Sequence, residues 1–323
     1  MGKARARRLG AAVLLGLLAA LSVTANGAEF PAKPITIVVA FPPGGVDQVG
    51  RAMQAELARA LKVEIAISNR PGATGTTGTA EVAGAPPDGY TLLLSPQGPL
   101  AYQPHIRSVA YGAASFAPIC RLTETPSVLM ASEKSGLKTV ADLLAAAKAA
   151  PGRVSYASAG EGGLPHVGMS AFSRVAGVEM RHLPRKGAGD AIDALVAGEA
   201  DLLAEQVPLA AARVGAGGLR VIAAFAAQRI AAFPDVPTMK EQGYDLSFSA
   251  WNVLVAPAGT PAAVIDTLDK ACAAALAAPA TVEAMQSRLR TPPAYLGPAA
   301  TAAFIRSEVA RGKELVEASG LKR

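Results

Sequence analysis

The chain has 323 residues, 51% of them hydrophobic, which is enough for one large or two medium domains of roughly 100 to 200 residues each. This composition excludes an intrinsically disordered chain. Because only 17% of the residues are charged and the mean hydropathy is +0.30, a membrane protein has to be considered first.

The first 28 residues have the pattern of a secretory signal peptide. Four cations between Lys3 and Arg8 precede an uncharged run over residues 9–23, and small residues follow at positions 25, 27 and 28. No later segment reaches the roughly 18 uninterrupted apolar residues that a bilayer span needs. We therefore expect the leader to be removed on export and the mature protein to be soluble.

The net charge of +6 depends on this leader. Without its four cations, 27 Lys and Arg face 25 Asp and Glu, which leaves a charge of +2. Binding to a phosphate backbone needs a clustered excess of cations. We therefore expect no nucleic-acid partner.

Two cysteines, Cys120 and Cys272, lie 152 positions apart. They could form a disulfide or stay buried as thiols. Leu268, Cys272 and Leu276 recur every four positions on an expected helix, a spacing that favours a buried thiol at Cys272.

Along the chain, short β-branched runs alternate with Ala-rich stretches of helical periodicity, which is typical of parallel sheets with crossover helices. The first unit has expected strands at residues 35–41, 63–68 and 91–95, and a helix with Met53, Leu57 and Leu61 on one face. The same rhythm then restarts. The second unit has expected strands at 128–131, 154–158, 180–183, 201–204 and 219–224, and helices at 140–148, 165–175 and 190–196.

The final third contains an expected strand at 251–255 and helices at 261–278 and 301–317, but no third complete sheet. We expect these elements to return to the first sheet, so that the second unit is an insertion. The predicted fold is α/β, with two parallel or mixed sheets flanked by helices. Lobe 1 would comprise residues 29–123 and 225–323, and lobe 2 residues 124–224, with a two-segment hinge near 121–125 and 223–226.

Three of the expected strands run into glycine-containing loops that open helices: residues 43–45, 160–163 and 187–189. Such loops lie at the carboxyl edge of a parallel sheet, where the free N–H groups of a helix start can bind an anion. Each loop taken alone also fits an ordinary tight turn.

Motifs for catalysis and metal binding are missing from the sequence. The loop 71–79 has no lysine and is not a P-loop, and Ser158 lacks the preceding glycine of a nucleophile elbow. No spacing of Cys, His and Asp matches a zinc or calcium site. His166 opens a helix beside the second glycine loop and is interpreted as a surface or packing residue, with ligand contact as the alternative.

From Phe30 onward the chain resembles the extracytoplasmic solute receptors of tripartite tricarboxylate transporters, the Bug family. The matching segments occur in family order: FPAKPITIVVAFPPGG (30–45), NRPGATGTTG (69–78), PPDGYTLLL (86–94), PGRVSYASAGEG (151–162), PDVPTMKEQGY (234–244) and WNVLVAPAGTP (251–261). The resemblance implies a type II-like periplasmic binding protein of two lobes, without enzymatic activity, cofactor or metal. Such a receptor binds a small carboxylated solute between its lobes and presents it to a membrane permease.

The resemblance also implies the ligand-binding residues. In the first lobe they are Pro43, Gly44, Gly45, Asp47, Ser95, Gln97 and Gly98. In the second lobe they are Ser158, Ala159, Gly160, Gly162, Gly163, His166, Arg185, Lys186, Gly187, Ala188, Gly189 and Asp201.

Departures from the family pattern fall on these loops. Only Val46 separates Gly45 from Asp47, where two residues are usual, and Gly163 replaces a small hydroxyl residue. Arg185 stands where a tyrosine is usual, so the ligand could carry more negative charge, or the guanidinium could be solvated at the rim.

Two other functions stay open at this point. The receptor could pass its signal to a membrane sensor kinase without transport, which the sequence does not separate from a transport role. A periplasmic hydrolase using Ser158 or Asp47 would require a base within reach, and the scarcity of histidine argues against it.

Overall fold

The first sheet combines strands from the N-terminal third with segments that return to it later in the chain. In the computed structural model, which describes residues 30–289 and 291–321, β1 (Ile35–Val39) pairs in parallel with β2 (Ile65–Asn69) and β3 (Thr91–Pro96). The strands β9 (Ser249–Pro257), β4 (Phe116–Ser132) and β10 (Pro293–Leu296) complete it in antiparallel pairings, in the order β2-β1-β3-β9-β4-β10. The chain divides into two units, residues 1–32 and 33–323, and all these strands belong to the second.

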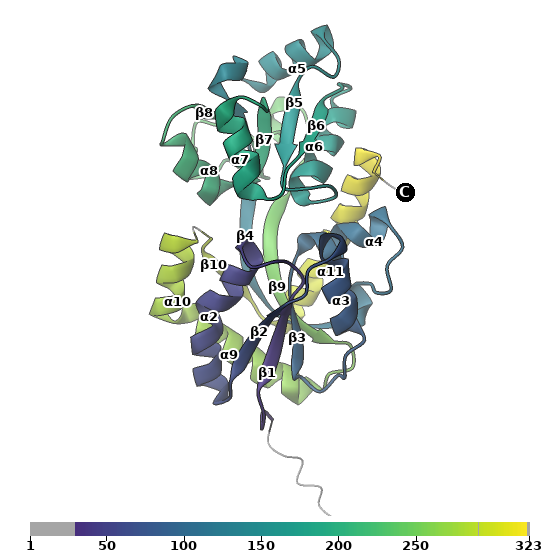
Figure 1. Cartoon of the computed structure of the whole chain (residues 1–323), viewed down its shortest axis with the longest axis vertical. Coiled ribbons are helices and arrows are strands. Elements are labelled where there is room, and N and C mark those ends of the chain that lie inside the picture. The colour runs from purple at the N-terminus through teal and green to yellow at the C-terminus, as the bar shows by residue number, and fades with distance from the viewer. Residues whose placement is uncertain (1–29, 290, 322–323) are drawn as a thin grey trace, which may run out of the picture. The chain divides into compact units, whose positions relative to one another are not determined.

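The second sheet is inserted between β4 and β9. It has the order β8-β4-β7-β5-β6 and consists of the end of β4 with β5 (Ser155–Ser158), β6 (Arg181–Pro184), β7 (Leu202–Gln206) and β8 (Leu219–Phe225). The strands β5, β6 and β7 are parallel, so their carboxyl ends share one edge. Figure 1 shows this sheet above the first one.

One long strand belongs to both sheets. β4 has 17 residues, or about 55 Å at roughly 3.3 Å per residue. Its residues 116–126 pair with β9, and its residues 127–132 pair with β7 and β8. From the sequence only its end is predicted, as a strand at 128–131, because the prolines at 118 and 126 interrupt the apolar pattern.

The second connection lies further along the chain than predicted. Residues 226–248 still pack on the second sheet: the rings of Phe225 and Phe248 stack at 4.2 Å, and Met239 N donates to Ala224 O at 2.8 Å. The chain leaves this sheet only with β9, at Ser249, and not at 223–226. The sequence of these 23 residues has no long periodic run that would indicate the sheet on which they pack. In the structure, their β pairing is limited to isolated β-bridges among the described residues.

We use first lobe and second lobe for the elements that pack on the first and on the second sheet. Relative movement of the two predicted lobes stays a prediction. Their predicted bounds are residues 29–123 with 225–323 for lobe 1 and 124–224 for lobe 2.

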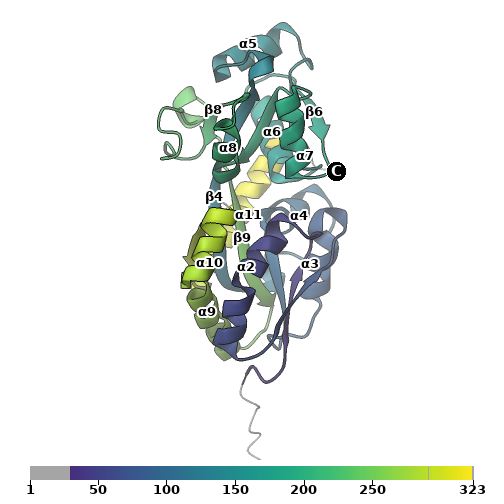
Figure 2. The same cartoon turned by 60° about the vertical axis from the view of Figure 1, so that its left-hand side comes forward.

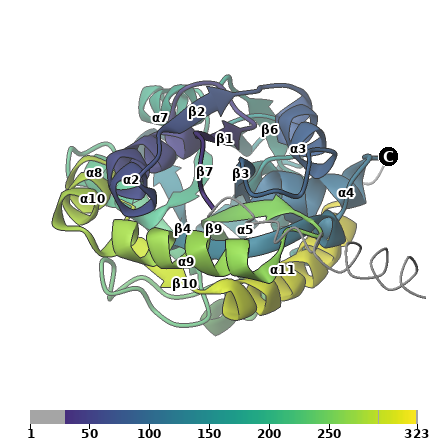
Figure 3. The same cartoon turned by 90° about the horizontal axis from the view of Figure 1, so that it is seen from below.

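Helices cover both sheets. On the first lobe these are α2 (Gly45–Leu61), α3 (Thr76–Ala83), α4 (Gln103–Ile106), α9 (Ala262–Ala277) and α10 (Pro279–Glu283); on the second lobe they are α5 (Val140–Ala149), α6 (Leu164–Val175), α7 (Ala188–Ala197) and α8 (Val207–Val214). The predicted face of α2 is correct, because Met53, Leu57 and Leu61 are all buried. Figure 3 shows α9 alongside β4.

The C-terminal helix α11 (Pro298–Ser319) contacts both lobes, which the sequence analysis did not predict. It packs on β4 and on the segment Gly98–Tyr102 of the first lobe, and on α6 of the second. At Gly312 a Cβ would lie 2.1 Å from the carbonyl oxygen of Ala101, so only glycine permits this close approach. Near the middle of the helix, Glu308 accepts a hydrogen bond from Trp251 Nε1 at 2.9 Å. Figure 2 shows α11 passing from one lobe to the other.

The two cysteines are joined. Cys120 in β4 and Cys272 in α9 form a disulfide, with their Cα atoms 6.7 Å apart. The expectation that Cys272 is buried is correct, since its exposure is 0%, but the expectation of a thiol there was wrong. Packing of α9 on β4 brings the two residues together, and that pairing of elements is not visible in the spacing around Cys272 alone.

The signal-peptide prediction, residues 1–28, lies outside the described residues. Among the helices that the structure does describe, none has the length and apolar character that a bilayer span requires.

Candidate ligand-binding site

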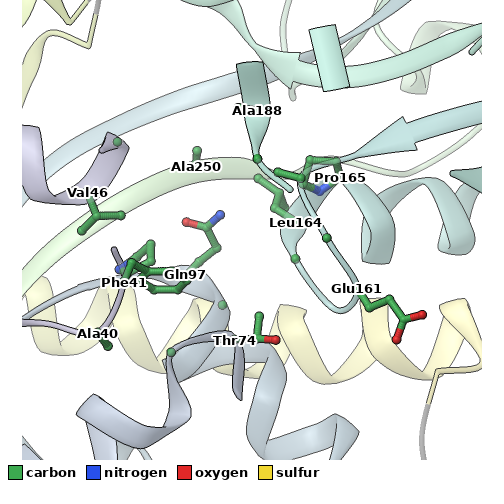
Figure 4. Close-up of a pocket in the computed structure, with 18 of the residues that line it drawn as sticks. Ala40, Phe41, Val46, Thr74, Gln97, Glu161, Leu164, Pro165, Ala188 and Ala250 are labelled. Atoms are coloured by element: carbon green, nitrogen blue, oxygen red, sulfur yellow. The ribbon is translucent and has the colours of Figure 1, made fainter. Parts of the chain in front are cut away.

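A cavity of about 570 Å³ lies between the two lobes, at the ends of their strands. Its first-lobe wall comes from the loop after β1, the loop 71–75 and the segment after β3; its second-lobe wall comes from the loops after β5 and β6 and from the end of β7. Ser127 of β4 and Ala250 of β9 close it at the crossing strands. Figure 4 shows Gln97 and Leu164 on facing sides of the cavity, while Glu161 points away from it.

The N-termini of three helices supply backbone N–H groups to this cavity. Gly45 opens α2, Gly163 precedes α6, and Gly187 precedes α7, and all three glycines line the cavity. The first N–H groups of a helix have no partner within the helix and carry partial positive charge. The loop before α6 needs a backbone that disfavours side chains, because Gly160 has a φ of 126°. The cavity therefore offers backbone donors from both lobes to an anionic group.

Nine of the predicted site residues line this cavity. They are Gly45, Gln97, Gly98, Ala159, Gly160, Gly163, Lys186, Gly187 and Ala188. Gln97 is fixed in place, because its Oε1 accepts a hydrogen bond from Trp251 N at 3.1 Å.

The other ten are not part of the lining. They are Pro43, Gly44, Asp47, Ser95, Ser158, Gly162, His166, Arg185, Gly189 and Asp201. Most lie one or two residues from a lining residue, but the charged and hydroxyl side chains among them have partners elsewhere.

Asp47 points away from the cavity into the first lobe. Its carboxylate is 2% exposed and accepts a hydrogen bond from Arg51 Nε at 2.8 Å, one turn along α2. Burial raises the pKa of this carboxyl, but the polar groups around it, chiefly the hydrogen-bonded Arg51, outweigh this effect, so the pKa is below its usual value. Asp47 thus stabilises the first turn of α2, where a negative charge is favourable.

Asp201 and Arg185 are also engaged outside the cavity. Asp201 Oδ2 accepts hydrogen bonds from the backbone N and the hydroxyl of Ser155, at 2.7 and 2.8 Å, at the amino end of β5. Arg185 donates to Glu199 Oε2 at 2.9 Å. Arg185 therefore lies in an ion pair next to the lining residue Lys186 and is not itself part of the lining, and its contact with the ligand stays a prediction.

Ser158 has a histidine within reach, contrary to the sequence expectation. Its Oγ lies 2.7 Å from His182 Nε2, and the ring of His182 stacks on His166 at 3.8 Å. Ser158 is 0% exposed, however, and its hydroxyl also contacts Gly160 O at 3.0 Å. Burial lowers the pKa of both rings to about 4, and for His182 the neighbouring His166 adds to this effect. Ser158 and the two histidines thus hold the glycine loop 160–163 from below the cavity surface. In particular, His166 Nδ1 accepts a hydrogen bond from Gly162 N at 2.9 Å.

Several lining residues are not among those predicted from the sequence. Phe41, Val46 and Leu164 lie within two residues of predicted ones, whereas Thr74, Glu205 and Gln206 come from segments without a predicted lining residue. For the last two a signal existed: β7 ends at Gln206, and the carboxyl edge of a parallel sheet is where ligands bind. The predicted strand stopped at residue 204, so its end was placed two residues too early.

Glu205 is the buried carboxyl of this wall. It is 6% exposed, and its Oε1 accepts a hydrogen bond from Gln206 N at 2.7 Å. Burial raises the pKa of Glu205 to about 7, and the hydrogen bond from Gln206 opposes this only in part.

A second cavity of about 420 Å³ adjoins the first on the side of α2 and α8. The two share Gly45, Val46, Gln97, Ala188 and Glu205 among their lining residues. The second one is further lined by Asn252 and Arg288. Within residues 30–289 and 291–321, no cluster of His, Cys, Asp and Glu is arranged to hold a metal ion.

Two joined α/β lobes with a cavity at their strand ends define a solute-binding protein of the periplasmic type. Residues 49–321 match the model of the tripartite tricarboxylate transporter family receptor (TctC). This chain belongs to that family, and its members are solute receptors and not enzymes.

Similarity to individual proteins agrees with this membership. The chain is 33% identical to protein BugT of Bordetella pertussis over 309 residues, which cover 94% of each chain. Among solved structures it resembles the periplasmic binding protein BugD, with a TM-score of 0.74, 29% identity and coverage of 91% and 99%. MatC from Rhodopseudomonas palustris with bound malate has a TM-score of 0.77 at 30% identity, with coverage of 89% and 100%. A second R. palustris protein, with adipate, has a TM-score of 0.77 at 26% identity, with coverage of 90% and 99%. The predicted two-lobed periplasmic binding protein fold is thereby confirmed.

Proposed function

We propose that this chain is a periplasmic receptor that binds a small organic acid in the cavity between its lobes. The observation that carries the proposal is the convergence of the α2, α6 and α7 starts, from both lobes, on one cavity that Lys186 also lines. Backbone N–H groups at helix starts favour an anion without any charged side chain. The malate and adipate complexes of similar structures support an acid of this size.

We further propose that the receptor delivers its solute to the membrane permease of a tripartite tricarboxylate transporter. The family match supports this partner. The alternative is delivery of a signal to a membrane sensor kinase, and the two outcomes differ in cells. Deleting the receptor gene should abolish uptake of the identified acid if it serves a permease. It should change transcription but not uptake if it serves a kinase.

A thermal-shift screen of malate, adipate, citrate and related acids tests ligand binding. A ligand at 100 times its dissociation constant adds about 2.7 kcal/mol to the free energy of unfolding, so binding should raise the melting temperature clearly. Hits are then quantified by calorimetric titration. The proposal fails if no carboxylate in the screen stabilises the protein.

Export is part of the proposal. Cleavage between Ala25 and Glu29 should yield the mature protein in the periplasmic fraction. Mass spectrometry of the protein from that fraction reads the new N-terminus, and an intact leader there would contradict the proposal.

A further inference from the structure

Glu205 occupies the junction of the two cavities. It lies at the end of β7, opposite Val128 of β4 in the antiparallel register, and it lines both cavities. Ala188, at the start of α7, lines both cavities as well. A ligand at this junction therefore meets a helix start, which favours an anion, and a carboxyl group, which favours a cation.

Among the described residues, no cation pairs with Glu205. In the part of the chain that the structure describes, its one hydrogen-bond partner is the neutral backbone N–H of Gln206. Among residues 30–289 and 291–321, the other ionisable side chains that line the first cavity are Glu161 and Lys186, and Arg288 joins Glu205 in the second. Glu161 directs its carboxylate away from the cavity (Figure 4). Glu205 thus faces the ligand as a buried carboxyl whose charge the described residues leave uncompensated.

A buried ionised carboxylate is unfavourable without a cation or several hydrogen bonds. A ligand with negative charge at both ends would add a like charge to this junction. A ligand with an ammonium group would supply the missing partner, in a charge-assisted hydrogen bond.

Resting on the proposed function, we propose that the ligand is an amino acid in the broad sense, whose carboxylate meets the helix starts and whose protonated nitrogen meets Glu205. The raised pKa of Glu205 fits a site that lacks its cation when empty. Bound ammonium would lower that pKa again, because an adjacent positive charge favours the ionised form. Glu205 is then the residue that separates amino acids from the corresponding simple acids.

The test compares acids that differ only in the amino group: aspartate with succinate, glutamate with glutarate, and alanine with propionate. Calorimetric titration of the mature protein at pH 7 should give at least one pair in which the amino acid binds tenfold or more tightly than its partner. In the Glu205→Gln variant that amino acid should lose at least tenfold in affinity, while its partner stays within twofold or binds more tightly. The control is Glu199→Gln, which removes an exposed carboxylate bound to Arg185 outside the cavity and should keep the preference.

Proton linkage gives a second readout on the unmodified protein, in case Glu205→Gln does not fold. Titration in buffers of different ionisation enthalpy should show proton release when the amino acid binds, because the pKa of Glu205 falls.

The outcomes separate the two proposals. If simple acids bind as well as or better than their amino partners, or if binding takes up protons, the assignment of Glu205 is wrong and the acid receptor stands. If no acid of any pair binds, the assignment of Glu205 fails. The proposed function fails with it only if no carboxylate in the thermal-shift screen stabilises the protein either.

Discussion

Gln103 Nε2 in α4 of the first lobe donates a hydrogen bond to the carbonyl oxygen of Gly162 in the second lobe, at 3.2 Å. Gln103 is 0% exposed, and Gly162 belongs to the glycine loop that precedes α6. This hydrogen bond links the two lobes directly, next to the lining residues 159–161 and 163–165. It holds the glycine loop in the arrangement that the helix starts require.

Removing this link should favour separation of the lobes. Gln103→Ala is expected to weaken ligand binding about two- to tenfold, since a hydrogen bond contributes roughly 0.5–1.5 kcal/mol. Solution scattering should show a larger radius of gyration for the variant without ligand. Gln54→Ala is the control, because Gln54 donates to Ile65 O within the first lobe, at 2.7 Å. Equal effects of the two substitutions would contradict a role for Gln103 in closure.

The disulfide between Cys120 and Cys272 should stabilise the first lobe. It closes a loop of 152 residues, and disulfides that close long loops typically contribute about 2–4 kcal/mol. Urea unfolding with and without reductant should show this difference in the free energy of unfolding. In the double variant Cys120→Ala, Cys272→Ala the reductant should have no effect. Two titratable thiols in the unreduced, denatured protein would show that the bond does not form.

Acid should destabilise the second lobe through its stacked histidines. Burial lowers the pKa of His166 and His182 from 6.5 to about 4. Protonation therefore favours the unfolded chain, so their contribution is complete above pH 6.5 and is lost as the pH falls from 6.5 toward 4. Urea midpoints measured across this range should fall more in the wild type than in His182→Phe. The control, His105→Gln, changes a histidine outside the stack, and a profile like that of His182→Phe would refute the assignment.

Much of the fold is predictable because the strands and helices of each α/β unit have recognisable local sequence patterns. The apolar runs and the face of Met53, Leu57 and Leu61 indicate the strands and α2 directly. The connections are less visible, because they depend on pairing between distant segments. β4 joins both sheets because β9 pairs with its first part and β7 and β8 with its last. α11 joins both lobes because it packs closely on the first lobe where Gly312 meets Ala101, and also packs on α6 of the second.

The candidate site also has a predictable part and an unpredictable part. Glycine loops at strand ends are predictable, because backbone donors at helix starts do not depend on side-chain direction. Side chains beside them are not, because neighbouring partners decide where they point. Asp47 turns to Arg51 and Asp201 to Ser155, whereas Glu205 has no such competing side chain and faces the cavity.

Arg185 and Lys186 are adjacent in sequence but should differ in their effect on binding. Arg185 NH2 donates to Glu199 Oε2 outside the cavity, and ion pairs of this exposed kind contribute only about 0–1 kcal/mol. Arg185→Ala and Arg185→Tyr should therefore leave the affinity for the acid within about twofold. Lys186 lines the cavity, and loss of a charge-assisted hydrogen bond of roughly 1.5–3 kcal/mol predicts a ten- to hundredfold weakening for Lys186→Ala.

Both positions are measured by calorimetric titration at one fixed salt concentration, because salt screens exposed charges. Thermal melts of each variant without ligand separate a loss of binding from a loss of folding. Should Arg185→Ala weaken binding more than tenfold while Lys186→Ala does not, the guanidinium must leave Glu199 when the ligand binds. The carboxylate of the ligand would then contact Arg185, next to the end of β6. Lys186 would lie at the edge of the cavity without contacting the ligand.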